Sequence, residues 1–195
     1  MQVGKLIDKL KEEGLYENTV IMFTSDNGPT FNGGTDSPFF DSAQPFKSEH
    51  GWGKGFLREG GIRVPLIVSW PGVVSPGTET SCPFAFWDVM PTLCDIAKTD
   101  APDNIDGISF YNTLTNSGDQ EAHDYLYWEF PEYQGQVAVR MGKWKIIWKE
   151  IKKGNKEIEL YNLEEDIKEL NNLSAAHPEI IAKLIDIIRE EHQTP

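Results

Sequence analysis

The sequence predicts a mixed α/β protein, with helices and part of a larger sheet over residues 1–120 and a small antiparallel sheet packed with a helix over residues 121–195. Three observations predict this arrangement. Residues 19–24 and 64–69 are rich in β-branched side chains and apolar on both faces, as parallel strands buried between helix layers are. Short strand-like runs and an amphipathic helix follow residue 120. Hydrophobic residues make up 39% of the 195 residues, which is enough to bury a core.

The N-terminal segment predicts a helix followed by a buried strand. Val3, Leu6 and Leu10 recur at helical spacing, and Gly14 supplies a C-terminal stop. A helix, a polar link and a buried strand form half of a βαβ unit, so we expect the sequence to begin within a fold. Part of the strand's apolar surface should then be exposed or covered by another molecule.

A loop of more than 30 residues, from Gly28 to Gly61, connects the two predicted strands. Loops of that length inside compact domains are usually functional or disordered. The phenylalanines of this loop and Trp52 favour order, because they can anchor it on a core. After the second strand, residues 87–97 predict a helix with Asp88 as its N-cap.

Around residue 120 the pattern changes again. Met141-Gly142 predicts a hairpin turn, and Ile180 and Leu184 lie on one face of a helix that begins near Pro178. Four runs before that helix are expected to form the antiparallel sheet. They are residues 125–129, 136–140, 143–149 and 157–160.

The charge and the cysteines exclude several classes of protein. The chain carries 18 Lys and Arg against 31 Asp and Glu, a formal charge of −13 that repels polyanions, so we expect no nucleic-acid partner. No stretch reaches the roughly 18 consecutive apolar residues of a membrane span. The first residues lack the apolar core of a signal peptide. Cys82 and Cys94 are too few for a disulfide framework or a zinc cage, and are core thiols or one bridge.

The first candidate functional residues are Asp26 and Asn27, directly after the first predicted strand. Ligands in open α/β sheets collect at the carboxyl ends of strands. A carboxylate and an amide oxygen, turned by Gly28, suit a hard cation, although Ca²⁺ takes roughly 6–8 oxygens and would need further ligands. The alternative interpretation is turn chemistry, because Asp, Asn and Gly dominate turns everywhere.

The second candidate is Lys54, which lies between Gly53 and Gly55. The glycines allow a close approach to a ligand, and an ammonium is a compact charge suited to a tetrahedral oxyanion such as sulfate or phosphate. The alternative is a solvated surface lysine. Nearby, we interpret Arg58 with Glu59 as a structural ion pair.

A basic run lies between Arg140 and Lys156, with seven Lys and Arg against one acidic residue. One interpretation is the solvated face of an antiparallel ribbon. The other is a local patch, including Lys149 and Lys152, that guides a polyanionic sulfated glycan. Among the histidines, His123 offers no constellation in sequence.

A series of motifs along nearly the whole chain resembles the type I sulfatase family in order and spacing. The motifs are Thr24–Gly28, Gly33-Gly34, Phe39-Phe40, Pro45–Lys47, Lys54, Glu59–Pro65, Ile67–Gly72, Asp88–Thr92, Asp106-Gly107, Arg140–Lys145 and Glu159–Glu164.

This resemblance implies an alkaline-phosphatase-like fold and the hydrolysis of sulfate esters by a formylglycine, made from a Cys-x-Pro-Ser-Arg motif. It implies that Asp26 and Asn27 are ligands of the active-site Ca²⁺ and that Lys54 is a catalytic residue that binds the substrate's sulfate. The implied substrate is a sulfated small molecule or glycan, and the implied location is periplasmic or secreted.

The sequence departs from the family in its nucleophile, because no Cys-x-Pro-Ser-Arg motif is present and Cys82-Pro83 has the proline one place too early. We therefore expect a C-terminal portion of a sulfatase that is inactive by itself. Its partner would be the missing N-terminal half, or a second copy over the exposed sheet edge. A phosphoester or phosphonate hydrolase of the same superfamily and a noncatalytic module that binds sulfated glycan are the alternatives.

Overall fold

The computed structural model describes residues 2–30 and 34–192, which form two compact units. The first unit contains Met1–Thr24 and Leu66–His123, and the second contains Ser25–Pro65 and Asp124–Pro195. The long loop between the two predicted strands thus belongs to the same unit as the C-terminal sheet. Gly33, quoted above for its motif, lies outside the described residues.

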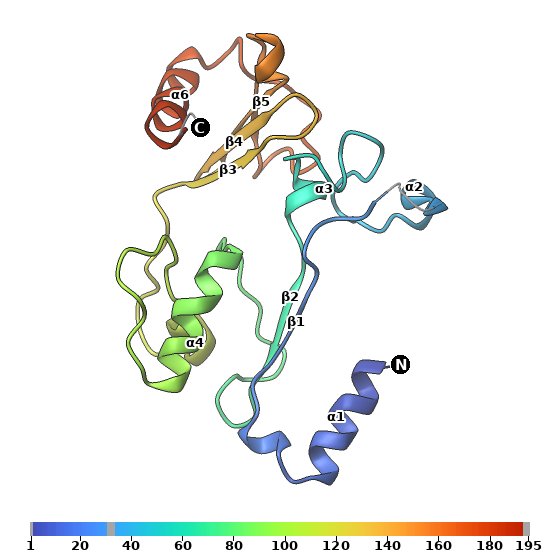
Figure 1. Cartoon of the computed structure of the whole chain (residues 1–195), viewed down its shortest axis with the longest axis vertical. Helices are drawn as coiled ribbons and strands as arrows, with labels where there is room; N and C mark the ends of the chain where they lie inside the picture. The colour runs from blue at the N-terminus through green and yellow to red at the C-terminus, as the bar shows by residue number, and fades with distance from the viewer. Residues whose placement is uncertain (1, 31–33, 193–195) are drawn as a thin grey trace. The chain divides into compact units, whose positions relative to one another are not determined.

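The first unit combines helices with a two-stranded sheet (Figure 1). Its helix α1 ends before Gly14, whose φ of +68° is left-handed, as a C-terminal stop requires. No described helix has both the length and the apolar content to cross a membrane. Its elements are α1 (Gln2–Glu12), η1 (Tyr16–Asn18), β1 (Ile21–Thr24), β2 (Leu66–Ser69), η3 (Phe86–Asp88), α4 (Val89–Ala97) and α5 (Tyr111–Thr115).

The prediction that these two strands lie parallel between helix layers is wrong. Strands β1 and β2 pair antiparallel, with Ile21 opposite Ser69. Side chains of both strands are exposed: Phe23 by 50% and Ile67 by 60%. An apolar run indicates that its side chains tend to be buried, but it does not predict whether the neighbouring strand runs parallel or antiparallel. The exposed apolar surface expected for the first strand is present.

Asp88 was predicted to cap the N-terminus of α4, but its side chain bonds elsewhere. It directly precedes α4, but its side chain makes no capping hydrogen bond to that helix. Its fully buried carboxylate instead accepts hydrogen bonds from Ala85 N at 2.7 Å and Ile108 N at 2.9 Å. Cys82 and Cys94 are free thiols, so the alternative of one disulfide bridge is wrong.

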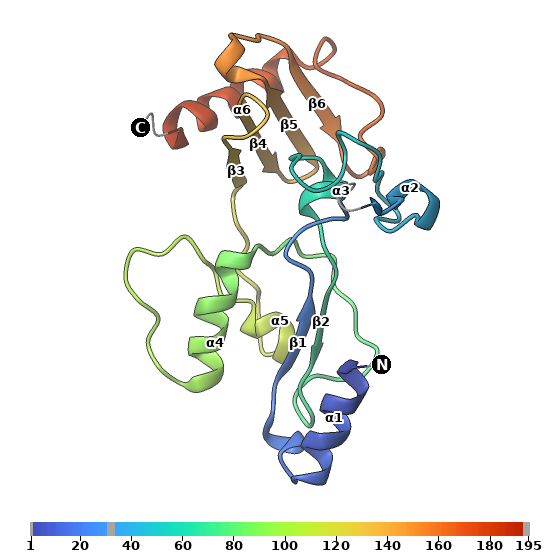
Figure 2. The same cartoon turned by 45° about the vertical axis from the view of Figure 1, so that its right-hand side comes forward.

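The second unit is built on a four-stranded antiparallel sheet in the order β3-β4-β5-β6, with α6 on one side of it (Figure 2). The predicted strands and final helix are confirmed, with boundaries shifted by one or two residues. Its elements are α2 (Ser37–Phe40), α3 (Glu59–Ile62), β3 (Leu126–Phe130), β4 (Gln136–Met141), β5 (Trp144–Lys149), η4 (Ile151–Lys153), β6 (Ile158–Asn162) and α6 (Pro178–Glu191).

The two faces of this sheet bury different partners, as the alternation of side chains along a strand requires. On one face, Val139 and Ile146 pack with Leu184 of α6. On the other face, Ile147 packs with Leu57, which lies in the long loop just before α3. The long loop therefore covers the face of the sheet opposite α6.

Candidate functional site

Asp26 and Asn27 lie in a turn that their own neighbourhood holds in place. Ser25 Oγ donates to Asn27 O at 2.8 Å, and Asn27 Nδ2 donates to Gly28 O at 2.9 Å. The amide nitrogen is thereby engaged, which leaves Asn27 Oδ1 as the atom for a cation. The Asp26 side chain is exposed. Turn chemistry and an oxygen donor pair therefore coexist in these residues.

Gly28 joins this turn to α3 by backbone contact. Its N–H donates to Gly61 O at 2.9 Å. A Cβ atom on Gly28 would lie 1.8 Å from Gly60 O, which leaves room for no larger residue without movement of the backbone. The close approach of two chain segments, rather than a special φ angle, requires glycine here.

Lys54 is exposed and is carried by a loop that interlocks with the same turn. Its backbone N–H donates to Pro29 O at 2.9 Å. The preceding Gly53 packs so closely on Pro29 O that a Cβ atom would lie 2.3 Å from it. The structure thus brings the backbone that carries Lys54 against the backbone that follows Asp26 and Asn27.

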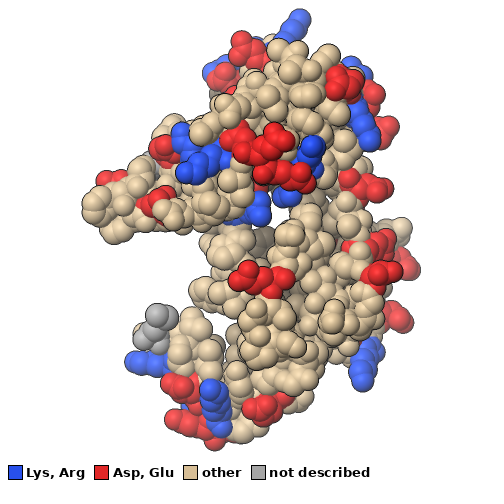
Figure 3. Space-filling view, turned by 180° about the vertical axis from the view of Figure 1, so that it is seen from behind, with Lys and Arg blue, Asp and Glu red and all other residues tan. Residues whose placement is uncertain are grey.

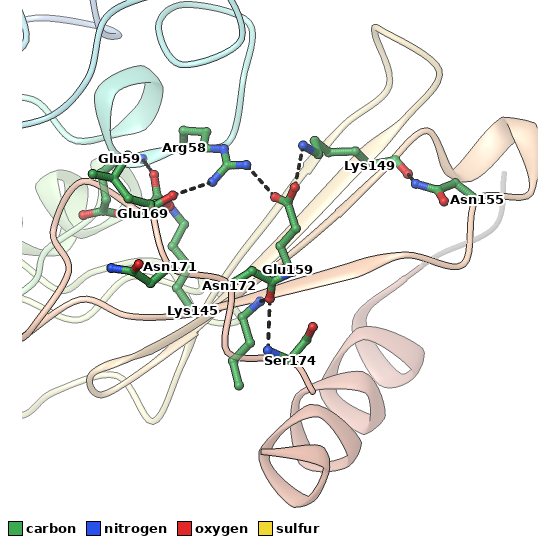
Figure 4. A network of polar contacts seen from close by, with 12 residues as sticks. Arg58, Glu59, Lys145, Lys149, Asn155, Glu159, Glu169, Asn171, Asn172 and Ser174 are labelled. Atoms are coloured by element: carbon green, nitrogen blue, oxygen red, sulfur yellow. Dashed lines mark hydrogen bonds and ion pairs between the residues drawn. The ribbon is translucent and has the colours of Figure 1, made fainter. Parts of the chain in front are cut away.

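A buried ionic cluster holds α3 on the sheet (Figure 4). Lys145 projects from β5 with no exposed surface, and its Nζ lies 2.8 Å from Glu59 Oε1 and 3.0 Å from Glu169 Oε1. Glu169 Oε2 accepts a hydrogen bond from the backbone N–H of Glu59 at 2.8 Å. Because Glu59 begins α3, these contacts fix the segment against which Gly28 packs.

The pKa values of the two carboxyl groups in this cluster shift in opposite directions. Burial alone would raise the pKa of Glu59, but Lys145, Arg140 and Arg63 together hold that pKa below its usual value. Burial prevails at Glu169 and raises its pKa, with help from the nearby Glu59 charge and against the attraction of Lys145. Glu169 Oε1 has the Lys145 charge beside it, but the contact lacks the alignment of a hydrogen bond.

Arg58 is structural, as predicted, but its predicted partner was wrong. Its guanidinium donates to Glu159 Oε2 at 2.6 Å and to Glu169 O at 3.3 Å, and lies 4.2 Å from the centre of the Trp52 ring (Figure 4). The carboxylate of Glu59 pairs instead with Lys145 and with Arg63. The pairs Arg58–Glu159 and Lys145–Glu59 join residues 101 and 86 positions apart, so adjacency in sequence was a poor guide to them.

The basic run does not form a continuous exposed patch. Lys145 is buried, Lys149 pairs with Glu159 at 2.8 Å, and Lys153 pairs with Glu150 at 2.6 Å. Lys152 Nζ donates to the carbonyl oxygen of Pro131 at 3.0 Å. Basic side chains lie among acidic ones on the face shown in Figure 3. Acidic side chains therefore neutralise part of the basic run, and the interpretation that it guides a sulfated glycan stays a prediction.

Sequence reasoning missed an aromatic group beside Lys54. The rings of Phe56 and Tyr133 stack with centroids 4.9 Å apart and an angle of 15° between their planes. The His50 ring meets Phe56 edge-on, with centroids 5.6 Å apart. Tyr133 comes from the turn between β3 and β4, so no local pattern could have indicated the contact.

His123 was also missed, because its partner lies 35 positions away in sequence. Its Nε2 lies 2.8 Å from Asp88 Oδ1 within the first unit, and its ring meets Trp87 edge-on. The contact closes the segment before His123 onto the start of α4, and we assign it a structural role.

The donor set fits a hard cation but is incomplete. The described ranges, 2–30 and 34–192, contain no group of three or more His, Cys, Asp and Glu side chains able to hold a metal. Asp26 and Asn27 both offer oxygen, as Ca²⁺ prefers, but they amount to two of its roughly 6–8 ligands. A Ca²⁺ ion held by these two residues would need its remaining ligands from other residues.

Comparison with known proteins assigns this arrangement to a family. The family profile described as N-sulphoglucosamine sulphohydrolase, C-terminal, matches residues 48–194. N-acetylgalactosamine-6-O-sulfatase of Bacteroides thetaiotaomicron is 29% identical over 95% of this chain and 39% of its own length. A sulfatase of Formosa agariphila is 32% identical over 90% of this chain and 34% of its own length.

A solved structure extends the likeness to three dimensions. That structure is described as a protein in complex with its substrate, D-glucosamine-2-N,6-O-disulfate. It matches this chain with a TM-score of 0.76 and 27% sequence identity. The match covers 96% of this chain and 37% of that one. The chain therefore spans less than two fifths of the length of each of these relatives.

Proposed function

Because the chain belongs to the sulfatase family of the alkaline-phosphatase-like superfamily and matches its C-terminal portion, we propose that it supplies metal and sulfate contacts to a sulfuric ester hydrolase. The proposed substrates are sulfated sugars. Two relatives support this class by their descriptions, one as an N-acetylgalactosamine-6-O-sulfatase and one by its bound glucosamine disulfate.

In this proposal Asp26 and Asn27 hold a Ca²⁺ ion and Lys54 binds the sulfate. The bound cation would polarise a sulfate oxygen and offset the charge that develops on the transferring group. The Lys54 ammonium would contact the same sulfate and help to orient it, because a compact point charge suits a tetrahedral oxyanion. The nucleophile, expected as a formylglycine, would come from a different part of a longer protein.

The observation that carries the proposal is the interlocked backbone of the two loops. The hydrogen bond Lys54 N–Pro29 O joins the candidate metal turn to the loop that carries Lys54, and Gly28 N–Gly61 O joins the same turn to α3. Both loops in turn rest on α3 and its buried ionic cluster. A rigid arrangement of this kind is what electrostatic stabilisation of a transition state requires.

The isolated chain provides the first test. We expect it to bind Ca²⁺ no more tightly than the ~10⁻³ M of the weakest dedicated sites, because it offers two ligands. We also expect no turnover of an aryl sulfate or of N-acetylgalactosamine 6-sulfate. Micromolar Ca²⁺ affinity by calorimetry would show that the ligand count is wrong, and turnover would show that the chain contains a nucleophile.

A complete sulfatase that contains this chain provides the second test. Lys54→Ala should lower kcat for a sulfated sugar by about 10²–10³-fold, the usual effect of removing one group that stabilises the transition state. Lys183→Ala, on the exposed side of α6, is the matched control and should leave kcat unchanged. Equal rates in both variants would overturn the role of Lys54. Hydrolysis of phosphate esters but not of sulfate esters would favour the phosphoester alternative.

A further inference from the structure

The Phe56–Tyr133 pair lies in the second unit beside Lys54 but has no role in the function proposed so far. Tyr133 is 53% exposed, although a large aromatic side chain usually gains by burial. Its ring lies nearly parallel to that of Phe56, at 15°. One face of the tyrosine ring is therefore covered by Phe56, and the side chain still offers aromatic surface to solvent.

Two contacts join the turn that carries Tyr133 to Gly55, the residue that follows Lys54, and a third holds the turn itself. A Cβ atom on Gly55 would lie 2.9 Å from Tyr133 Cε2, so the ring lies directly against the Gly55 backbone. Gln136, which is 2% exposed, donates from Nε2 to Gly55 O at 2.9 Å. Lys152 Nζ holds the same turn through Pro131 O at 3.0 Å.

The backbone of this turn is left-handed over three successive residues. Tyr133 has a φ of +50° and Gln134 a φ of +70°, both in the left-handed region that β-carbon-bearing residues seldom adopt. Gly135 follows with a φ of +82°. Strained residues of this kind persist where the surrounding structure fixes them, and they gather at binding sites.

We propose that the Phe56–Tyr133 pair binds the ring of the sugar whose sulfate is held by Lys54. The negative face of an aromatic ring attracts the weakly positive C–H groups on the apolar face of a pyranose. The proposal rests on the proposed function, because it makes Lys54 the sulfate contact. It adds that the turn between β3 and β4 selects sulfated sugars over other sulfate esters by recognising the sugar ring.

A sugar fits this surface better than an extended apolar ligand does. Glu132 and Gln134 flank Tyr133 in sequence and are exposed, and Lys54 is exposed on the adjoining loop. Polar groups around a single aromatic ring can bond to hydroxyls while the ring covers the apolar face. A lipid or a large aryl group offers no hydroxyls with which those polar groups could bond.

Saturation-transfer NMR on the full 195-residue chain tests the pair directly. The probes are N-acetylgalactosamine 6-sulfate, unsulfated N-acetylgalactosamine and inorganic sulfate. Tyr133→Ala should weaken binding of both sugars by about 5–10-fold, as loss of one aromatic contact does, and should leave inorganic sulfate unaffected. Tyr133→Phe keeps the ring and should bind as the unaltered chain does. An unchanged amide spectrum shows that each variant is folded.

The controls separate this proposal from the function on which it rests. Phe39→Ala removes another exposed aromatic ring of the second unit, in α2, and should change nothing. Lys54→Ala should weaken binding of the sulfated sugar and of sulfate but not of the unsulfated sugar. If Lys54→Ala acts in this way while Tyr133→Ala binds both sugars normally, the ring-binding role is overturned and the sulfate contact stands. Failure of the chain to bind either sugar would also overturn it.

Discussion

A Lys145→Met substitution would leave Glu59 and Glu169 buried without their shared cation. Lys145 has no exposed surface, and its Nζ lies 2.8 Å from one carboxylate and 3.0 Å from the other. At an effective dielectric constant of about 20, one contact at 2.8 Å amounts to roughly 6 kcal/mol of attraction. Desolvation offsets part of this, and breaking a buried pair costs about 3–5 kcal/mol. We expect a loss of that size in the free energy of unfolding of the second unit.

Native-state hydrogen exchange is the appropriate assay, because it reports on β5 separately from the first unit. The protection of the Ile146 and Ile147 amides should fall by about 10²–10³-fold, at tenfold for each 1.4 kcal/mol. Lys183→Met removes an exposed charge from α6 and should stay within about 0.5 kcal/mol of the unaltered chain. A loss below about 1 kcal/mol in Lys145→Met would refute the reasoning, because it would mean that water or another cation compensates the two carboxylates.

The same cluster predicts how stability depends on pH. The pKa of Glu169 is raised above 4.5 in the folded chain, so its contribution is complete below that value and is lost as the pH rises through the raised pKa. The pKa of Glu59 is lowered below 4.5, so its contribution is present above that value and is lost as the pH falls through the lowered pKa. Urea titrations at each pH measure this dependence. The Glu169→Gln variant should no longer lose stability as the pH rises above 4.5, and it should still lose stability as the pH falls below 4.5.

Two further substitutions test the packing inside each unit, one substitution for each. Gly28→Ala would place a Cβ atom 1.8 Å from Gly60 O and should destabilise the second unit by about 1–3 kcal/mol, measured by urea unfolding. Its control, Gly4→Ala in α1, meets nothing within 4 Å and should stabilise its helix by up to about 1 kcal/mol. Asp88→Asn removes one of two carboxylate acceptors, so we expect a loss of about 1–3 kcal/mol and faster exchange of the Ile108 amide. An unchanged exchange rate at Ile108 would contradict the assignment of Asp88.

Local patterns predicted the elements of the second unit well, because they depend on neighbours in sequence. Alternating side chains and a hairpin turn are sufficient for β3–β6, and the helical spacing of apolar residues is sufficient for α6. The antiparallel pairing of β1 with β2 was not predictable in the same way. An apolar run records which residues avoid water, whereas strand direction depends on how the chain returns.

The candidate site likewise contains residues that the sequence predicted and contacts that it did not. Asp26, Asn27 and Lys54 were predicted from residue type and position, and the structure brings their backbones together through glycine contacts. The charges that support them were not predictable. Lys145 lies 86 positions from Glu59, and Tyr133 reaches its aromatic partner from a different turn. Such pairings exist only once the sheet has formed.

The buried ions give the loop that carries Lys54 a directional anchor that an apolar contact would not give. Hydrophobic contact has no direction, whereas the 2.8 Å contact of Lys145 with Glu59 requires two particular atoms to meet. Replacing the cluster with Lys145→Met, Glu59→Gln and Glu169→Gln together removes the buried ammonium and both buried carboxylates at once, so it should recover part of the stability that Lys145→Met alone loses. The recovery stays partial because Arg63 loses its partner Glu59. The triple variant should not recover the order of the loop. We therefore expect the Lys54 amide, which donates to Pro29 O, to exchange faster in the triple variant than in the unaltered chain at equal global stability. Equal protection of that amide would mean that the cluster contributes stability alone, and that the packing of Gly28 on α3 is sufficient to position the loop.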